Sequence, residues 1–146
     1  FFASGLMVPC GLEFGFKKEM NVVSTMPDDW ENTETDLSDF FKKINDIKNQ
    51  YKILNEECEL QVVDQPNWMN VFCFRKVSFD GRERILRMVN KDVNNHQFVH
   101  FGNLNSAIGS GGEVIDISPM YTMPSVNKYF EYNLRPGQLI LLYAAG

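Results

Sequence analysis

The sequence predicts an α+β chain in which the final strand-helix unit of a TIM-like (β/α)8 barrel is followed by an all-β antiparallel sandwich. A glycine-bracketed apolar run occupies residues 5–15, and an amphipathic helix pattern begins at Asp36. From residue 56 onward only strand-like sequence remains. We therefore assign residues 1–55 to the C-terminal end of a barrel and residues 56–146 to a β-sandwich domain.

The apolar run, Gly-Leu-Met-Val-Pro-Cys-Gly-Leu-Glu-Phe-Gly, predicts a strand buried on both faces, as in a parallel sheet covered by helices. It ends in Glu13 beside Phe14 and a glycine, and α/β proteins place such polar groups at the C-terminal mouth of a strand. A buried strand needs neighbours, and no earlier segment supplies one. We therefore interpret Phe1 as a cut end.

Residues 16–34 are polar and broken, with a turn signal at Pro27-Asp28-Asp29-Trp30, and predict an ordered excursion. Trp30 is its anchor. An exposed tryptophan here would suit sugar stacking, but large aromatic side chains seldom stay exposed. Packing against the neighbouring helix is therefore the favoured interpretation of Trp30.

The helix pattern begins with Asp36 as a candidate N-cap and Asp39 in the first turn. Apolar residues then recur at helical spacing, and the opposite face is predicted to be solvated. The apolar positions are Leu37, Phe40, Phe41, Ile44, Ile47 and Tyr51, and the polar ones are Lys42, Lys43, Asn45, Asp46, Lys48 and Asn49.

Beyond residue 56, strand-like runs alternate with turn residues in the pattern of a sandwich. The candidate strands are Glu59 to Val63, Met69 to Phe79, Arg82 to Asn90, Gln97 to Phe101, Val114 to Ile117, Lys128 to Asn133 and Gln138 to Tyr143. Asp80-Gly81 predicts a tight hairpin between the second and third strands. Arg135-Pro136-Gly137 predicts a turn before a closing strand that is apolar on both faces.

Charge and cysteine content exclude several classes of partner. Nineteen acidic and fourteen basic residues give a net charge of −5, and basic residues cluster no further than pairs, which argues against nucleic acid. No apolar span approaches transmembrane length, so we expect no membrane partner. Three cysteines, at positions 10, 58 and 73, fit neither a zinc site nor a disulfide framework and are interpreted as reduced, buried thiols. A cytoplasmic location is slightly favoured.

The residues themselves predict no catalytic group, metal or cofactor. His96 and His100 would lie roughly 13 Å apart along a strand, with no third ligand in register. Gly109-Ser110-Gly111-Gly112 leads into a strand, whereas a phosphate-binding loop opens a helix, so it is predicted to be a turn. Glu13 has no partner for the paired carboxyl groups of glycoside cleavage.

Four segments, in their order along the chain, resemble the C-terminal end of the alpha-amylase family of glycoside hydrolases and transglycosidases (glycoside hydrolase family 13). Gly5 to Gly15 resembles that family's eighth barrel strand, and Asp36-Leu-Ser-Asp-Phe-Phe-Lys-Lys-Ile-Asn45 resembles its eighth helix. Ile85-Leu-Arg-Met-Val-Asn90 resembles a strand ending in Val-Asn in the domain after the barrel. Leu134-Arg-Pro-Gly-Gln-Leu-Ile-Leu-Leu142 resembles its closing strand.

There are departures from the family pattern. Cys10-Gly11-Leu12 stands where Tyr-x-Gly is usual, and residues 15–19, Gly-Phe-Lys-Lys-Glu, are similar to a divergent, maltosyltransferase-like branch. The resemblance implies an alpha-glucan substrate, retaining double displacement without an organic cofactor, and catalytic carboxylates upstream of Phe1. It also implies that Glu13 and Phe14 shape the edge of the sugar cleft, and we take Trp30 as a third candidate substrate-binding residue. The remainder of the barrel is then a partner, and this chain alone is expected to be inactive.

A second hypothesis comes from another class of protein. Residues 56–146 could form a non-catalytic carbohydrate-binding or protein-interaction β-domain, with residues 1–55 as an adapter. The upstream reading frame would discriminate between the two hypotheses, because only the enzyme requires barrel strands that carry an Asp nucleophile and a Glu acid.

Overall fold

The computed structural model describes residues 4, 5, 7–21 and 23–146. The chain forms two compact units, Phe1–Asn55 and Glu56–Gly146. Each unit is described by itself below. Among the described residues, no helix has the length and apolar character needed to cross a membrane.

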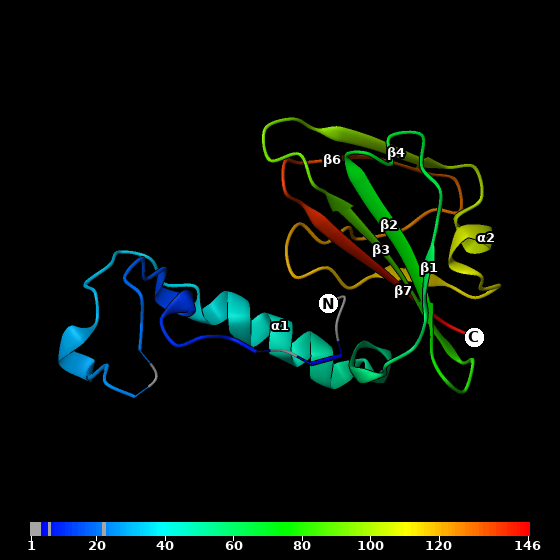
Figure 1. Cartoon of the computed structure of the whole chain (residues 1–146). Helices are drawn as coiled ribbons and strands as arrows, with labels where there is room; N and C mark the ends of the chain where they lie inside the picture. The colour runs from blue at the N-terminus through cyan, green and yellow to red at the C-terminus, as the bar shows by residue number, and fades with distance from the viewer. Residues whose placement is uncertain (1–3, 6, 22) are drawn as a thin grey trace. The chain divides into compact units, whose positions relative to one another are not determined.

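The unit Glu56–Gly146, which is described throughout, is mostly antiparallel β-sheet, as predicted (Figure 1). Its strands are β1 (Leu60–Val62), β2 (Val71–Val77), β3 (Glu83–Asn90), β4 (Gln97–Phe101), β5 (Val114–Asp116), β6 (Phe130–Leu134) and β7 (Leu139–Ala145). A five-stranded sheet has the order β1-β2-β3-β7-β5, and β4 pairs with β6 in a second sheet. This arrangement is consistent with the predicted sandwich.

The core of this unit lies between the two sheets. In the larger sheet, Cys73 pairs with Met88, and Met88 pairs in turn with Ile140, which sets three inward side chains in one row across the strands. Val99 and Phe101 of β4, with Phe130 and Leu134 of β6, complete the same buried cluster. Because side chains alternate along a strand, Phe98 and His100 of β4 and Glu131 and Asn133 of β6 face outward.

The opposite face of the larger sheet is also buried at its centre. Ile85 and Leu141 are fully buried there, so β7 is apolar on both faces as its sequence predicts. Lys76 is buried as well, and its Nζ donates a hydrogen bond to the Glu56 carbonyl oxygen. A buried ammonium group needs such an acceptor, because burial without one would favour its neutral form.

Two turns contain a glycine in the left-handed backbone conformation, as their sequences predict. Gly81, at the β2–β3 hairpin, has φ 72°, and Gly137, before β7, has φ 67°. Only glycine adopts this left-handed region without steric cost. Buried Asn90 fixes the second turn, because its Nδ2 donates to the Arg135 and Asn95 carbonyls at 2.9 and 2.8 Å. The Val-Asn strand end is thus a structural junction.

A short helix that the sequence did not predict, α2 (Leu104–Ile108), precedes the glycine-rich segment. The Asn103 side chain accepts a hydrogen bond from the Ser106 amide at its start, and Gly109 ends it with φ 78°. The glycines therefore follow a helix and lead to β5. Their placement is that of a turn and not of a phosphate-binding loop.

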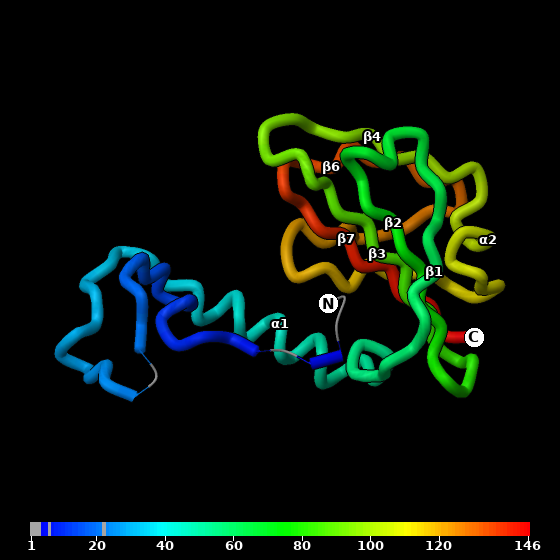
Figure 2. The backbone as a smooth tube through the Cα atoms, in the orientation of Figure 1, coloured from blue at the N-terminus to red at the C-terminus, as the bar shows by residue number. Residues whose placement is uncertain are grey.

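The described residues of the unit Phe1–Asn55 form α1 (Ser38–Gln50) and three 3-10 turns, η1 (Leu12–Phe14), η2 (Pro27–Asp29) and η3 (Lys52–Asn55). The strand predicted at Gly5–Gly15 is wrong as far as these residues are described, since residues 7–9 are irregular and residues 10–15 form a turn around η1. Leu6 lies outside the described residues. A strand requires a hydrogen-bonded neighbour, and the described residues of this unit contain none. Figure 2 draws the backbone as a tube, with α1 labelled.

Helix α1 differs from its prediction in two details. It begins at Ser38, with Asp36 two residues earlier accepting the Ser38 amide at 2.9 Å. Lys48, predicted to be solvated, is 7% exposed, and its Nζ donates to the carbonyl oxygens of Ser4 and Leu54 at 2.8 and 3.3 Å. These carbonyls draw the ammonium group inward from the polar face.

Candidate functional site

The three residues that the sequence singles out lie on one loop whose frame depends on two glycines. Gly11 and Gly15 flank η1 with φ 89° and 66°. A Cβ on Gly11 would lie 2.2 Å from the Phe16 ring, so the ring covers this backbone only because no side chain stands there. The amides of Phe14 and Phe16 both donate to the Gly11 carbonyl, at 3.1 and 3.0 Å. This tight turn fixes the backbone positions from which the Glu13, Phe14 and Phe16 side chains project.

Glu13 is partly buried beside the start of α1. Its backbone carbonyl accepts the Leu37 amide at 2.7 Å. Its side chain lines a hollow of about 470 Å³ with Val8, Ser38, Phe41, Lys42 and Asn45. One carboxylate oxygen, Oε2, is buried and accepts no hydrogen bond within the described part of the chain. A buried carboxylate oxygen without a donor is uncommon in folded proteins, and a ligand hydroxyl is one group that could supply the donor.

Phe14, Phe16 and Trp30 form what we call the aromatic cluster. The Phe14 and Phe16 ring centroids are 5.9 Å apart, and those of Phe16 and Trp30 are 6.3 Å apart, in tilted arrangements typical of aromatic pairs. Trp30 is 47% exposed. It therefore packs on Phe16 of the same loop and leaves about half of its surface to solvent, whereas its sequence favoured packing on the helix.

Glu31 is a residue of this loop that the sequence analysis did not single out. Its Oε2 accepts the backbone amides of Lys17 and Lys18 at 2.5 and 2.7 Å, which ties the two sides of the excursion together. It also lines a hollow of about 210 Å³ with the aromatic cluster, Asn32 and Thr33. Its position directly after Trp30 is the local signal that could have found it.

A second carboxylate, that of Asp29, holds the η2 turn that precedes Trp30. Asp29 accepts the Met26 amide at 3.0 Å, and Lys18 Nζ lies 3.7 Å from its other oxygen. The Met26 hydrogen bond, with the charge of Lys18, lowers the pKa of Asp29 from its ordinary value. Asp29 is therefore ionised at neutral pH. The Met26 hydrogen bond closes the η2 turn, so Asp29 serves the turn that its sequence predicts.

The predicted site residues do not share one hollow. Phe14 and Trp30 line the same hollow, whereas Glu13 lines the separate one beside α1. Trp30 also borders a third hollow, of about 330 Å³, together with Cys10, Met20 and Asn21. In the described part of the chain, no group of three or more His, Cys, Asp or Glu side chains could hold a metal ion. Rings beside carboxylates are suited to binding an uncharged, hydroxyl-rich molecule.

A further hollow, on the other unit, was missed by the sequence analysis. It measures about 530 Å³ and lies on the outward face of β4 and β6, where it is lined by Asn67, Gln97, Phe98, His100, Tyr129 and Glu131. We call it the β4–β6 hollow. The sequence analysis considered His100 only as a metal ligand. The signal was present in the alternation of β4, which predicts that Phe98 and His100 point away from the core.

Comparison with known proteins gives little resemblance. No family model matches the chain, and no curated protein matches it significantly. A solved structure titled "Crystal structure of AmyP in complex with maltose" aligns with a TM-score of 0.49 and 18% sequence identity. The alignment covers 67% of this chain and 18% of that one, so this chain matches only a small part of AmyP. A likeness of this size assigns neither an activity nor a ligand.

Proposed function

We propose that this chain is the C-terminal part of an alpha-glucan-active enzyme of the alpha-amylase family. In this proposal the unit Phe1–Asn55 ends the catalytic barrel, and the unit Glu56–Gly146 is the β-sandwich that follows and stabilises it. The loop bearing Glu13, Phe14 and Trp30 shapes the edge of the sugar cleft. The other partners are an alpha-glucan chain and the remainder of the barrel.

The observation that carries this proposal is the exposed edge of the aromatic cluster beside Glu31. A pyranose ring has apolar C–H faces and a rim of hydroxyl groups, so it binds where a flat aromatic surface adjoins hydrogen-bond acceptors. Trp30 offers the aromatic surface, and Glu31 lines the same hollow as Trp30. The glycine-framed turn holds Phe14 and Phe16 behind Trp30, so little ordering would be needed on binding.

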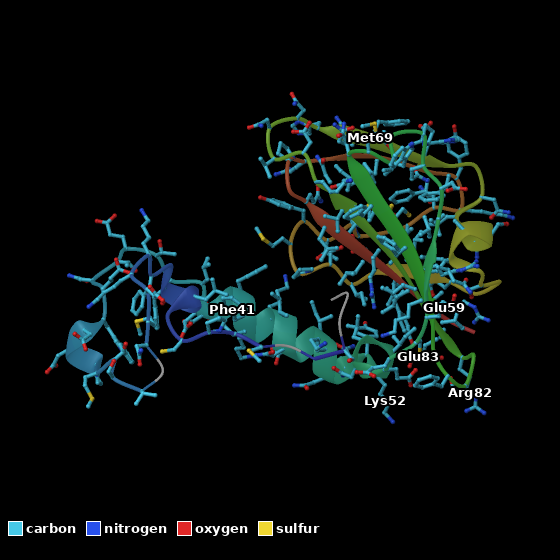
Figure 3. The ribbon with its side chains drawn as sticks, in the orientation of Figure 1. Phe41, Lys52, Glu59, Met69, Arg82 and Glu83 are labelled. Carbon is cyan, nitrogen blue, oxygen red and sulfur yellow. The ribbon has the colours of Figure 1, made fainter. Side chains whose placement is uncertain are left out.

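Helix α1 supports the assignment of the first unit to a barrel. Its apolar stripe, Phe40, Phe41, Ile44 and Ile47, is only half-buried. Figure 3 labels Phe41 on this helix. In a barrel such a stripe packs against the inner strands and neighbouring helices, so it would be covered by segments upstream of Phe1.

In this proposal the catalytic carboxyl groups belong to the upstream part of the enzyme and not to this chain. Retaining glycoside cleavage uses one ionised carboxylate as nucleophile and one protonated carboxyl as acid, on opposite sides of the scissile bond. In this proposal these groups follow earlier barrel strands, as the family resemblance implies. Residues of this chain would orient a sugar ring at the rim, through stacking on Trp30 and hydrogen bonds to nearby acids, without touching the reacting atoms.

The test is to express the chain together with its upstream coding region and to assay maltooligosaccharides. We expect glucan cleavage or transfer, and we expect Trp30→Ala to lower kcat/KM by about tenfold, the loss expected for one aromatic contact. Phe79→Ala is the matched control, because Phe79 is an exposed aromatic residue on the β2–β3 hairpin. An upstream region without barrel strands, or a Trp30 variant equal to the control, would overturn the proposal.

The alternative, a non-catalytic carbohydrate-binding or protein-interaction β-domain, has its own supporting observation. The β4–β6 hollow lies wholly on the unit Glu56–Gly146 and exposes two aromatic residues, Phe98 and Tyr129. A domain that binds sugar there would need nothing from residues 1–55. Under this alternative the upstream reading frame would encode a different kind of domain.

A further inference from the structure

We propose that the β4–β6 hollow is a second glycan-binding surface, separate from the loop of Trp30. The choice of an alpha-glucan as ligand rests on the proposed function, whereas the site itself rests on the geometry of β4 and β6. The hollow lies on one unit and needs no contribution from elsewhere in the chain.

The two-stranded sheet presents unusual residues on its outward face. His100 of β4 is paired with Glu131 of β6, and Phe98 is paired with Asn133 one step along. Phe98 is 56% exposed although its strand neighbours Val99 and Phe101 are buried. A phenylalanine exposed on one face of a sheet is unfavourable in water, and covering it with a ligand would offset that cost.

Tyr129 provides a second ring in a fixed position. Its ring meets the His100 ring edge-on with centroids 5.1 Å apart, and its hydroxyl donates to Glu131 Oε1 at 2.9 Å. The same hydrogen bond raises the pKa of Tyr129 from its ordinary value. With one edge and its hydroxyl anchored, the ring remains 59% exposed and is a rigid platform.

Asn67, in the loop before β2, lines the same hollow and is held by hydrogen bonds to β4. Asn67 Nδ2 donates to Gln97 Oε1 and to the Phe98 carbonyl, both at 3.1 Å. Gln97 in turn donates to Asp92 at 3.4 Å, which orients its amide. These bonds fix the orientation of the Asn67 amide, because both of its partners are acceptors. The loop before β2 is thereby held against β4, so the hollow exists before any ligand arrives.

The chemistry of the lining selects the class of ligand. Neither lysine nor arginine lines the hollow, and Glu131 adds negative charge, so phosphorylated ligands and nucleic acids are disfavoured. His100 and Glu131 are the two side chains there of the types that bind metals, one fewer than a metal site usually requires. Exposed rings, a carboxylate and amide groups together match a neutral polyhydroxylated ring, which stacks through its C–H face and bonds through its hydroxyls.

The experiment uses the 146-residue chain and maltoheptaose, with amide chemical shifts followed by NMR. We expect shifts in β4 and β6, and an apparent Kd that rises about tenfold in Tyr129→Ala and in Phe98→Ala, since each removes one stacking surface. Tyr129→Phe keeps the ring and loses the bond to Glu131, so a smaller loss is expected. Phe79→Ala is the matched control, and Figure 3 shows Arg82 of the same hairpin at the opposite end of β2 from Met69. Cellohexaose tests whether the linkage matters.

Failure of this inference can be told apart from failure of the proposed function. Shifts confined to the Trp30 loop, or Tyr129→Ala and Phe98→Ala variants that bind like the unchanged chain, would overturn the β4–β6 surface alone. Shifts in β4 and β6 that persist in Trp30→Ala would support the surface even if the upstream frame encoded no barrel. Thermal melts of each variant establish that a loss of binding is not a loss of fold.

Discussion

The Leu37 amide donates a 2.7 Å hydrogen bond to the carbonyl oxygen of Glu13, which ties the start of α1 to the turn that precedes the aromatic cluster. Asp36, next to Leu37, accepts the Ser38 amide in the same region, and hydrogen bonds from the Ser38 side chain and then from its amide lower the pKa of the Asp36 carboxyl group. The first turn of the helix and the loop of Phe14 are therefore one hydrogen-bonded assembly. Substitutions in the loop should therefore change the stability of the helix.

Gly15→Ala tests this link. Gly15 has φ 66°, and a Cβ there would lie 3.1 Å from Thr35 Cγ2, so alanine introduces both left-handed strain and crowding. We expect a loss of about 1–2 kcal/mol in the stability of the first unit. Helix content by circular dichroism should melt at a lower temperature. Gly5→Ala is the control, because nothing lies within 4 Å of its added Cβ. Equal melts of the two variants would contradict the prediction.

The half-buried stripe of α1 predicts that the chain by itself binds a hydrophobic dye or associates. Phe41 is part of that stripe, and exposed apolar surface costs roughly 25 cal/mol per Å². Phe41→Glu should lower the dye fluorescence, whereas Lys43→Glu, at an exposed position of the same helix, should not. A monodisperse monomer that binds no dye would show that the stripe is adequately covered within the chain.

Asn90 is expected to be among the least replaceable polar residues of the β unit. Its Nδ2 reaches the Asn95 and Arg135 carbonyls, and its Oδ1 accepts the Asp92 amide at 2.9 Å. Asn90→Ala leaves these groups unsatisfied in a buried place, at a cost of about 1–3 kcal/mol. Asn90→Asp should cost more at neutral pH, because a carboxylate would face two carbonyl oxygens. Urea unfolding followed by β-type circular dichroism measures both.

The stability of the β unit should fall in acid. The Asn94 amide, then the Asn95 side chain and amide, lower the pKa of Asp92 below its ordinary 3.8, and the Arg82 amide acts similarly on Asp80. A carboxyl group with a lowered folded pKa stabilises the fold above its unfolded pKa, and this contribution is lost as pH falls through the folded value. Melting temperatures should therefore drop below about pH 3.8.

Asp92→Asn isolates this effect. The amide keeps an acceptor oxygen and does not titrate, so the variant should lose less of its melting temperature between pH 7 and pH 3 than the unchanged chain. The pH-independent part of the change reports on the loop itself, which also orients Gln97 in the β4–β6 hollow. Parallel pH curves for the two proteins would show that Asp92 does not contribute.

The β unit could be predicted from sequence because its signals are local. Alternation places Val99 and Phe101 in the core, and glycines at positions 81 and 137 mark turns that need left-handed backbone. The Gly5–Gly15 strand failed for the opposite reason. Its apolar residues fit a buried strand, but a strand depends on a partner that local sequence does not supply.

The sites were harder to predict than the fold. Phe14 and Trp30 meet through Phe16, and Glu31 closes their loop by accepting amides from Lys17 and Lys18. No periodic pattern encodes such contacts. The β4–β6 hollow joins Asn67 and Tyr129, which are far apart in the sequence, so its outward rings were predictable from alternation but its walls were not.

The last prediction is that the 146-residue chain has no glycosidase activity. Retaining cleavage needs two carboxyl groups about 5 Å apart, one ionised and one protonated. Glu13 and Glu31 line different hollows, and Glu31 is already engaged with two backbone amides. Asp80, Asp92 and Asp116 accept hydrogen bonds from nearby turns and strand ends, which assigns them structural roles. Incubation with maltooligosaccharides and an activated aryl glucoside should release no product above the buffer rate. Turnover that disappeared in Glu13→Gln would make Glu13 catalytic and would contradict the assignment of the chemistry to upstream residues.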